Sequence, residues 1–222
     1  ILKYIFDGAQ ASGEEVKYVP VSIVYDLIPD VKEMTLQARG KQKSAESLSW
    51  LMGYVRKLGN NYGKISLRIG EPLDISDVPP KTIVDDFGTP AGYTGTVPRL
   101  AFKLVHRINE ITPVTTTSLI CNVLLSKYAL TKRAIERDIT ALMPLIENYN
   151  PNAFVDRGTA IGKSVQEALD LLTGAKIIDS LGDSLYTKYK IVSENYLSAT
   201  YYANMAAHHL YQRAFIELAM TH

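Results

Sequence analysis

The sequence contains very little cysteine: Cys121 is the only one among 222 residues. It lies in an apolar run, residues 119–123. A single thiol cannot form a disulfide within the chain, so the fold does not rely on an oxidising compartment. The sequence therefore predicts a reducing, cytosolic setting.

The sequence also lacks an excess of charge of either sign. It has 24 Lys and Arg residues against 23 Asp and Glu residues, a formal net charge of +1. Proteins that bind nucleic acid through its backbone need clustered cations to displace counterions. Nucleic acid is therefore not an expected partner.

Long hydrophobic runs are missing too. No stretch has the length of apolar sequence that a membrane-spanning helix needs, and no signal peptide is recognisable. We therefore expect any contact with a membrane to be peripheral. The chain begins at Ile1 rather than at Met and continues directly into an apolar segment, so we expect it to be the C-terminal portion of a longer polypeptide.

Several common catalytic and ligand-binding motifs are absent. No group of His, Cys and carboxylate residues has metal-ligand spacing, and no Gly-x-Ser-x-Gly sequence occurs. Residues 158–164 resemble a phosphate-binding loop, but Arg157 stands where its first glycine belongs, so an ordinary loop leading into a helix is favoured. The sequence predicts neither a metal nor a cofactor.

The first element that is present is a strand–helix–strand pattern. Residues 16–26 are β-branched and apolar with little alternation, as in a strand buried on both faces. Apolar residues at helical spacing follow in residues 48–58, and residues 64–73 then alternate. The apolar side of that second strand is Ile65, Leu67 and Ile69. The pattern predicts a βαβ unit with parallel strands and a right-handed crossover.

A boundary follows this unit. Residues 76–98 contain four prolines and three glycines and show neither a helical nor a strand period. We therefore predict three parts. They are an α/β module in residues 1–80, a linker in residues 81–98, and a mainly helical domain in residues 99–222.

Beyond residue 98 the apolar residues recur at helical spacing. The predicted helices are residues 99–111, 113–130, 131–148, 163–173 and 193–220. Thr112 is the expected N-cap of the second helix, with Pro113 at its first position. Two short strands, residues 176–178 and 186–191, follow the fourth helix. Two helices and a hairpin in this order outline a winged-helix fold.

Segments of the first module resemble a known family when they are taken in order. Residues 19–26 read Val-Pro-Val-Ser-Ile-Val-Tyr-Asp, and residues 39–48 read Arg-Gly-Lys-Gln-Lys-Ser-Ala-Glu-Ser-Leu. Residues 62–65 read Tyr-Gly-Lys-Ile, and residues 70–72 read Gly-Glu-Pro. Together they resemble the last part of the catalytic domain of membrane-bound glycerol-3-phosphate acyltransferases. Residues 19–26 resemble the fourth of that family's four sequence blocks.

Two segments of the second module resemble the same family's C-terminal region. One is residues 107–115, and the other contains Tyr201, Tyr202, Asn204 and His208. The family usually has a basic residue where this chain has Ala203, so no role of that residue is carried over. The resemblance implies that residues 1–80 end an acyltransferase α/β domain and that a helical C-terminal domain follows.

The resemblance also implies an activity for the parent protein. Such an enzyme moves a fatty acyl group from acyl-CoA or acyl carrier protein to the 1-hydroxyl of glycerol 3-phosphate. The product is lysophosphatidate, which feeds phospholipid synthesis. The implied location is peripheral, at the cytoplasmic face of a membrane.

The catalytic pair of that family is absent. The family uses a His followed five residues later by Asp, in which the imidazole is the general base and the carboxylate fixes its tautomer. Here His106, His208 and His209 are followed at that distance by Ile111, Arg213 and Ala214, and His222 ends the chain. The family's arginine-bearing phosphate-binding blocks are also absent. We therefore expect this chain alone to be inactive.

Candidate substrate contacts remain in two places. The resemblance implies acyl-acceptor contacts near Pro20 and Ser22, although a proline tolerated at the edge of a buried strand is the alternative. Arg39, Lys41 and Lys43 form a basic run that could face the phosphate of glycerol 3-phosphate, the phosphates of coenzyme A, or anionic lipid. The alternative there is an exposed polar loop.

Other functions stay open. One is acylation of dihydroxyacetone phosphate by the same kind of enzyme. Another is a non-catalytic winged-helix-like docking module in residues 131–191. Residues 163–170 carry one Lys against Glu167 and Asp170, so protein docking is favoured over DNA binding. A membrane-apposed helical module is a third, but the last helix has only Arg213 as a basic residue.

Overall fold

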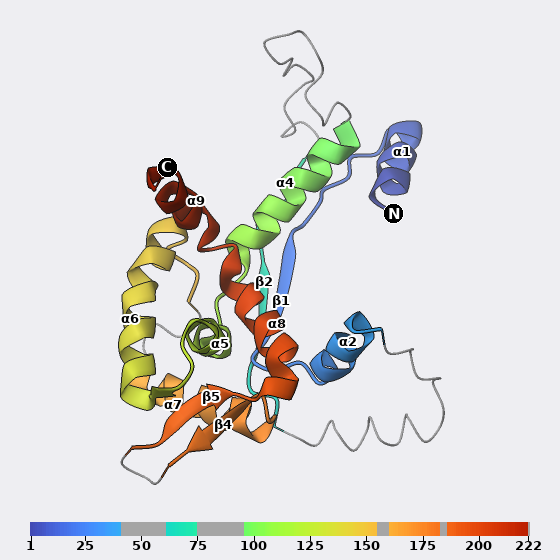
Figure 1. The fold of residues 1–222 in the computed structure, drawn as a ribbon. Helices are drawn as coiled ribbons and strands as arrows, with labels where there is room; N and C mark the ends of the chain where they lie inside the picture. Colours follow the sequence, from blue (N-terminus) through green and yellow to red (C-terminus); the bar gives the residue numbers. More distant parts are fainter. Residues whose placement is uncertain (41–60, 75–95, 155–159, 183–185, 222) are drawn as a thin grey trace, which may run out of the picture. The chain divides into compact units, whose positions relative to one another are not determined.

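The computed structural model describes residues 1–40, 61–74, 96–154, 160–182 and 186–221. The predicted helix of residues 48–58 and most of the predicted linker lie outside the described residues. The described part of the chain is mixed α/β and mainly helical, with two small sheets (Figure 1). It divides into two compact units. Unit 1 comprises residues 1–23 and 67–112, and unit 2 comprises residues 24–66 and 113–222.

Unit 1 contains two helices that contact each other, α1 (Leu2–Ser12) and α4 (Thr96–Ile111). α1 ends at Gly13, whose φ of 71° gives the left-handed C-cap that glycine adopts without steric cost. The small core of the unit is Tyr18, Leu73 and Leu100, with Leu2, Phe6, Val16 and Leu104 packed against it. Leu2 and Phe6 of α1 therefore face this core, whereas Ile5 is exposed.

The first sheet pairs β1 (Val21–Tyr25) with β2 (Ile65–Ile69). At one end the backbones of Tyr18 and Leu73 exchange two hydrogen bonds, of 2.9 and 2.8 Å. At the other end the Asp26 N–H donates to the Lys64 carbonyl at 3.0 Å. As residue numbers rise along β1, the numbers of their partners on β2 fall, so the two strands are antiparallel.

The predicted parallel βαβ unit is therefore wrong in the direction of its second strand. The spacing of apolar residues identifies a strand but not the direction in which it pairs with another. Antiparallel strands also need no crossover helix between them. The predicted burial of β1 on both faces is also wrong. Ser22 and Val24 are buried, whereas Val21 and Ile23 are exposed.

Unit 2 is organised around α5 (Thr116–Ser126). This helix packs against α6 (Lys132–Tyr149), α7 (Ile161–Gly174) and α8 (Tyr196–Ala207), and Figure 1 shows it end-on between α6 and α8. Seven of its 11 residues are buried, and none of the 11 is charged. Each fully buried Leu or Ile side chain contributes about 1.5–3 kcal/mol to folding. α5 is the centre of the main hydrophobic core.

Local capping explains where the helices begin. The Thr115 hydroxyl accepts a hydrogen bond from the Ser118 N–H at 3.2 Å, so α5 begins at Thr116 and not at the predicted Pro113. Thr112 belongs to the end of α4 instead, because its hydroxyl donates to the Ile108 carbonyl. The predicted start of the third helix is confirmed, since Thr131 caps α6.

The C-terminal helix is shorter than predicted. Residues 193–220 form a 3₁₀ turn (Ser193–Asn195), α8, and a separate helix α9 (Tyr211–Met220). Apolar residues at helical spacing continue through this interruption, which is why the pattern predicts one helix. A further short helix, α2 (Val31–Ala38), contacts α8. No described helix has both the length and the apolar character that crossing a bilayer requires.

The second sheet is antiparallel with the order β3–β5–β4. Its strands are β3 (Leu130–Thr131), β4 (Ile178–Leu181) and β5 (Lys188–Ile191). The predicted hairpin is confirmed, with its first strand about two residues later than expected. Tyr189 and Ile191 on β5 pack against the core of α5.

Tyr202 joins α8 to the segment that precedes α2. Its ring is almost fully buried, and its hydroxyl oxygen accepts a hydrogen bond from the Ile28 N–H at 2.8 Å. Burial raises the pKa of the Tyr202 hydroxyl to about 12, so the group stays neutral at physiological pH.

We predict that Tyr202→Phe lowers the free energy of unfolding by about 1–3 kcal/mol, because the Ile28 N–H is left buried without its acceptor. Urea denaturation at pH 7 measures the change. Tyr201→Phe is the matched control, and we expect it to have a smaller effect. Equal effects of the two substitutions would contradict the role given to the Tyr202 hydroxyl.

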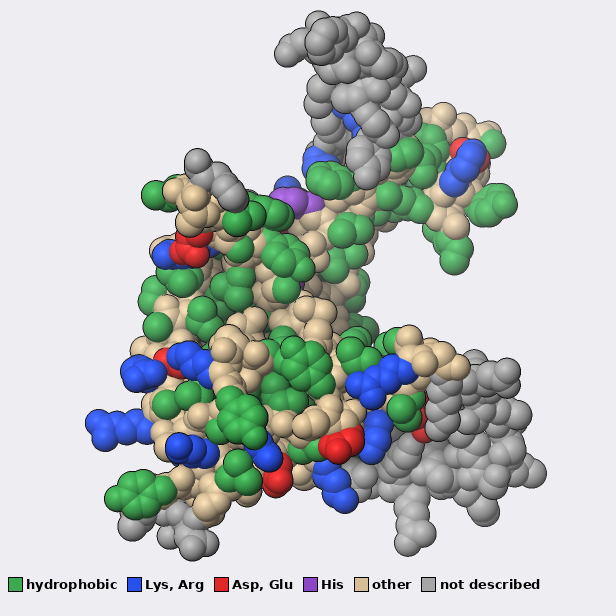
Figure 2. Space-filling model, in the orientation of Figure 1, with side chains coloured by type: hydrophobic (Ala, Val, Ile, Leu, Met, Phe, Trp, Pro, Cys, Tyr) green, Lys and Arg blue, Asp and Glu red, His purple; other side chains and the backbone are tan. Residues whose placement is uncertain are grey.

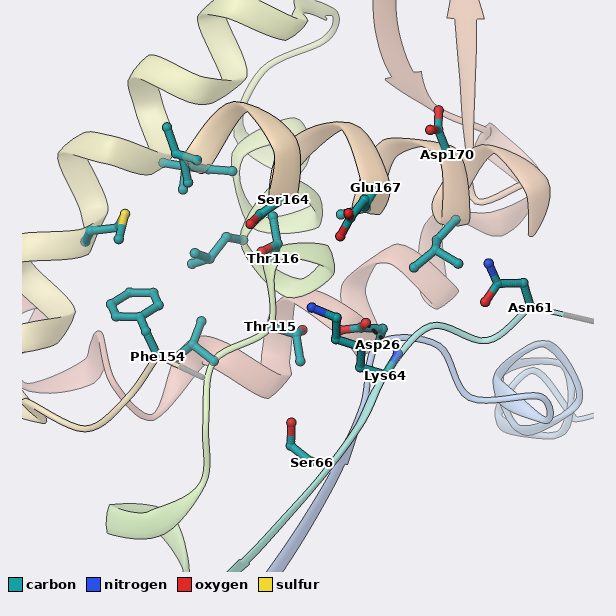
Figure 3. Close-up of a pocket in the computed structure, with 17 residues that line it drawn as sticks. Asp26, Asn61, Lys64, Ser66, Thr115, Thr116, Phe154, Ser164, Glu167 and Asp170 are labelled. Atoms are coloured by element: carbon teal, nitrogen blue, oxygen red, sulfur yellow. Dashed lines mark hydrogen bonds between the residues drawn. The ribbon is translucent and has the colours of Figure 1, made fainter. Parts of the chain in front are cut away.

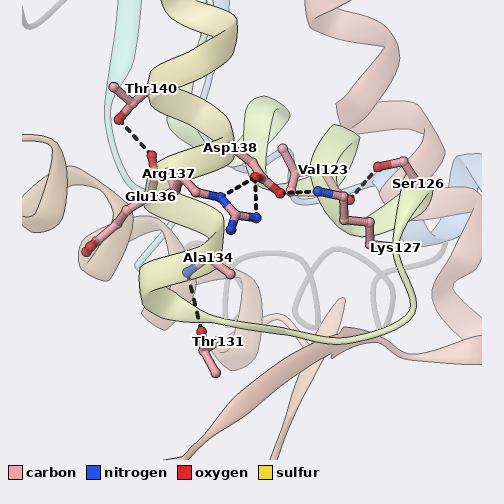
Figure 4. A network of polar contacts seen from close by, with 9 residues as sticks. All are labelled: Val123, Ser126, Lys127, Thr131, Ala134, Glu136, Arg137, Asp138 and Thr140. Atoms are coloured by element: carbon pink, nitrogen blue, oxygen red, sulfur yellow. Dashed lines mark hydrogen bonds and ion pairs between the residues drawn. The ribbon is translucent and has the colours of Figure 1, made fainter.

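A polar network fixes the first turns of α6 to the end of α5 (Figure 4). The Asp138 carboxylate accepts hydrogen bonds from the Lys127 ammonium and the Arg137 guanidinium. The hydrogen bond from Lys127 is the main reason why the pKa of Asp138 lies below its ordinary value, although partial burial opposes the shift. A depressed carboxyl pKa stabilises the fold above the unfolded-state pKa.

We predict that Asp138→Asn destabilises the chain at pH 7 by at most about 1 kcal/mol, as for other partly exposed ion pairs. The difference from the unsubstituted chain should shrink as the pH falls through the depressed pKa of Asp138, because the carboxyl group is then protonated in both states. Denaturation curves between pH 7 and acid measure it. A difference independent of pH would show that the ion pair is not its source.

Candidate functional site

Unit 2 contains a cavity of about 430 Å³ (Figure 3). The end of β1, the start of β2, the N-terminus of α5 and one side of α7 line it. Its polar side chains are Asp26, Asn61, Lys64, Ser66, Thr115, Thr116, Ser164, Glu167 and Asp170. The remaining lining is apolar and includes Leu119, Ile139, Met143 and Phe154.

Asp26 is held rigidly at the edge of this cavity. Its carboxylate accepts a hydrogen bond from the Lys64 N–H at 2.8 Å. Its backbone carbonyl accepts one from the Thr117 hydroxyl, also at 2.8 Å, and Thr117 is in turn bonded to Thr115. The residue therefore ties the end of β1 both to β2 and to the first turn of α5.

Gly63 makes this arrangement possible. Its φ is 76°, in the left-handed region that favours glycine. A Cβ atom there would lie 2.6 Å from the Cβ of Asp26 and 2.8 Å from the Cδ1 of Leu171. The Asn61 side chain accepts a hydrogen bond from the Gly63 N–H at 3.0 Å, which stabilises the turn.

α7 presents polar side chains to the cavity at intervals of three residues, namely Ser164, Glu167 and Asp170. Residues three apart lie on the same side of a helix. Glu167 is also 3.9 Å from Lys163, and Asp170 accepts a hydrogen bond from Gln166. With Asp26, the lining has three carboxylates against the single ammonium of Lys64.

This charge balance limits what the cavity can bind. Three carboxylates disfavour a phosphate dianion and favour a ligand with hydroxyl or amine donors. The apolar part of the lining suits a hydrocarbon body. No histidine is among the lining residues, so the described lining offers no imidazole base.

The residues predicted to contact substrate do not line this cavity. Pro20 and Ser22 belong to unit 1 and are buried on the inward face of β1. The Ser22 and Thr112 hydroxyls form a hydrogen bond of 2.8 Å, and the Pro20 carbonyl accepts one from the Gly70 N–H at 2.9 Å. Arg39 belongs to unit 2 and is exposed at the end of α2. Lys41 and Lys43 lie outside the described residues.

Sequence reasoning did not bring the cavity residues together. Asp26 ends the first predicted strand, whereas Glu167 and Asp170 belong to a predicted helix about 140 residues later in the chain. The spacing of Ser164, Glu167 and Asp170 was the available signal, but polar residues three apart are common on exposed helix faces.

The histidines have packing contacts in the described chain. The rings of His208 and His209 lie 3.9 Å apart between centroids, and His209 meets Tyr149 edge-on at 6.1 Å. His209 is almost fully buried. His106 lies 3.4 Å from Glu110 on α4. Within the described ranges, no cluster of three His, Cys, Asp or Glu residues could hold a metal ion.

Comparisons with known proteins identify relatives of this chain. Residues 34–222 match the model of the glycerol-3-phosphate acyltransferase C-terminal region. A Mycobacterium bovis protein named acyltransferase plsB1 is 30% identical over 224 residues, covering 99% of this chain and 35% of that protein. A Mycobacterium tuberculosis protein of the same name gives the same values.

A Shewanella glycerol-3-phosphate acyltransferase is 28% identical over 218 residues, covering 93% of this chain and 26% of that protein. The chain thus spans about a third or less of the length of these relatives. The family match covers most of the chain, including all of α5, the cavity-lining side of α7 and the second sheet. The chain therefore belongs to the family of glycerol-3-phosphate acyltransferase C-terminal regions.

Proposed function

We propose that this chain is the C-terminal part of an acyltransferase that moves a fatty acyl group from acyl-CoA or acyl carrier protein to the 1-hydroxyl of glycerol 3-phosphate. The product would be lysophosphatidate, a precursor of phospholipids. The observation that carries the proposal is the family match over residues 34–222. The name of the Shewanella relative supports the same acceptor.

In this proposal the chain does not perform the chemistry by itself. None of its histidines is followed five residues later by an aspartate, so it lacks the base that deprotonates the acceptor hydroxyl. Its role is to complete and support a catalytic domain whose His and Asp belong to a part of the longer protein outside these 222 residues. The packing contacts of His208 and His209 are consistent with a structural role.

We retain the predicted substrate contacts as part of the proposal. Pro20 and Ser22 would shape the wall of the acceptor site, and the hydrogen bond from Ser22 to Thr112 makes positioning a better role for Ser22 than direct binding. Arg39, with Lys41 and Lys43, would supply positive charge for a phosphate or for anionic lipid. The exposed position of Arg39 supports that role.

The proposed enzyme acts peripherally at the cytoplasmic face of a membrane, where its lipid product would be released. The carboxylates of the cavity argue against its use as the phosphate site. Acylation of dihydroxyacetone phosphate stays an alternative, because the two acceptors differ at a carbon that no described residue is known to contact.

A second candidate function is a winged-helix-like docking module. The element order α5–β3–α6–α7–β4–β5, with the strand order β3–β5–β4, favours it. On α7, Lys163 lies 3.9 Å from Glu167, and the Gln166 amide donates a hydrogen bond to Asp170, so these residues do not form a basic face. Such a helix suits a protein partner better than DNA.

The proposal predicts that this chain alone does not transfer palmitate from palmitoyl-CoA to glycerol 3-phosphate, whereas a polypeptide extended upstream to the length of the relatives does. The reason is the absence of the His and Asp pair from these residues. Formation of radioactive lysophosphatidate measures the activity, with dihydroxyacetone phosphate tested in parallel as acceptor.

Activity in the 222-residue chain would contradict the claim that it lacks the catalytic base. Activity of the longer polypeptide with dihydroxyacetone phosphate alone would replace the proposed acceptor. If a folded longer polypeptide has no activity with either acceptor and either acyl donor, the proposal fails and the docking module takes its place.

A further inference from the structure

Unit 1 has an apolar sheet face that no described residue covers. Its members come from β1, β2 and Val19, two residues before β1. Their exposed fractions are Val19 46%, Val21 42%, Ile23 56%, Leu67 60% and Ile69 68%. None of the five carries a polar side-chain atom, so the face offers no hydrogen bond or charge to a partner.

The five side chains lie together. The Pro20 carbonyl pairs with Gly70, and Asp26 pairs with Lys64. Counting inward from these bonds sets Val21 opposite Ile69 and Ile23 opposite Leu67. Directly opposed residues on one face of an antiparallel pair have their Cβ atoms about 4.5–5.5 Å apart. The exposed side chains therefore form a continuous strip and are not scattered.

The opposite face of the same strands is covered by the end of α4. Ser22 is bonded to Thr112 there, and the Arg68 guanidinium donates to the Ile111 carbonyl at 3.4 Å. Burial also lowers the pKa of Arg68, as expected for a side chain enclosed between strand and helix. Within unit 1, β1 and β2 thus direct Ser22 and Arg68 inward, and the aliphatic side chains of the strip outward.

This is the reverse of what an isolated two-layer unit requires. A sheet buries its more apolar face against another layer, and a two-stranded ribbon is marginally stable by itself. A contiguous exposed apolar strip of this kind marks a place where another surface packs. Without a charged or polar member, the strip fits an apolar protein surface and not a phosphate or a nucleic acid.

The relatives indicate where such a surface would come from. The matched segment is 35% of the Mycobacterium bovis protein and 26% of the Shewanella protein, so most of each relative lies outside it. Ile1 belongs to unit 1. Any polypeptide that precedes Ile1 is therefore joined directly to the unit that carries the uncovered strip.

We propose that the outward face of β1 and β2, formed by Val19, Val21, Ile23, Leu67 and Ile69, docks an apolar layer supplied by preceding polypeptide of the kind that the relatives carry. The sheet of unit 1 is then one half of an interface, and α4 covers only its other side. This inference rests on the proposed function to the extent that both require a longer polypeptide. It concerns packing, and its test needs no catalysis.

Thiol labelling tests it. Ile23→Cys and Leu67→Cys each place one reactive thiol on the strip, and Ser180→Cys on the exposed strand β4 of unit 2 is the matched control. The native Cys121 is fully buried, and burial raises its pKa to about 12, so it reacts slowly and reports whether unit 2 is folded. Maleimide labelling is followed by mass spectrometry in the 222-residue chain and in the longer polypeptide, whose additional cysteines are replaced by serine.

We expect the thiols at positions 23 and 67 to label about tenfold or more slowly in the longer polypeptide than in the 222-residue chain, as for a site that reacts only on local opening. The thiol at position 180 should label at the same rate in both. Equal rates at positions 23 and 67 in the two proteins would overturn the proposal.

A second result would also overturn the proposal. If the thiols at positions 23 and 67 label more slowly only in the 222-residue chain, and only as its concentration rises, the strip binds a second copy of this chain. Because labelling is read without an activity assay, a longer polypeptide that protects both positions but transfers no acyl group would support this inference while the proposed function failed.

Discussion

The burial of α5 is the constraint on which the rest of unit 2 depends. The helix has no charged residue, and three helices and the strand β5 pack against it. The buried side chains of α8 are small apart from Tyr202, namely Ser198, Ala199, Ala203 and Ala206. Small residues allow two helices to approach closely, and most of the apolar surface of α5 is removed from water.

Ala203 shows how this packing restricts the side chain at one position. It is 5% exposed. A lysine or arginine would have to bring its charge out of the packed region around α8 or shift the helix. The close contact with α5 and an alanine at position 203 are therefore two aspects of the same local arrangement.

The two ends of the first sheet depend on different surroundings. At its unit 2 end, Asp26 joins β1 to the capped first turn of α5 through Thr117, and Gly63 admits the close turn beside it. At its unit 1 end, the strands have α4 on one side and an uncovered aliphatic strip on the other.

Sequence reasoning succeeded where local interactions decide the structure. The Thr131 cap, the period of α6 and α7, and the hairpin of β4 and β5 all follow from residues close together in the chain. Sequence reasoning failed where contacts between residues far apart in the chain decide the structure. The antiparallel pairing of β2 with β1 and the outward direction of Ile23 are set by partners that a period does not reveal.

The candidate site shows the same division. The family was recognisable from ordered segments such as residues 19–26, and the match over residues 34–222 agrees with it. The grouping of Asp26 with Glu167 and Asp170 was not predictable, because about 140 residues separate them in the chain. The break between α8 and α9 was missed because the apolar pattern continues across it.

The central claim is that α5 and its neighbours form a core that is stable in this chain, whereas the ribbon of β1 and β2 in unit 1 needs a partner for full stability. Native-state hydrogen exchange of the 222-residue chain tests it most directly. The account predicts that the backbone amides of residues 119–124 exchange only through global unfolding. It predicts that the amides of Ser22 and Arg68, the positions whose N–H groups face the partner strand, exchange through a smaller opening at lower free energy. Equal protection of the two sets, or faster exchange in α5, would contradict it.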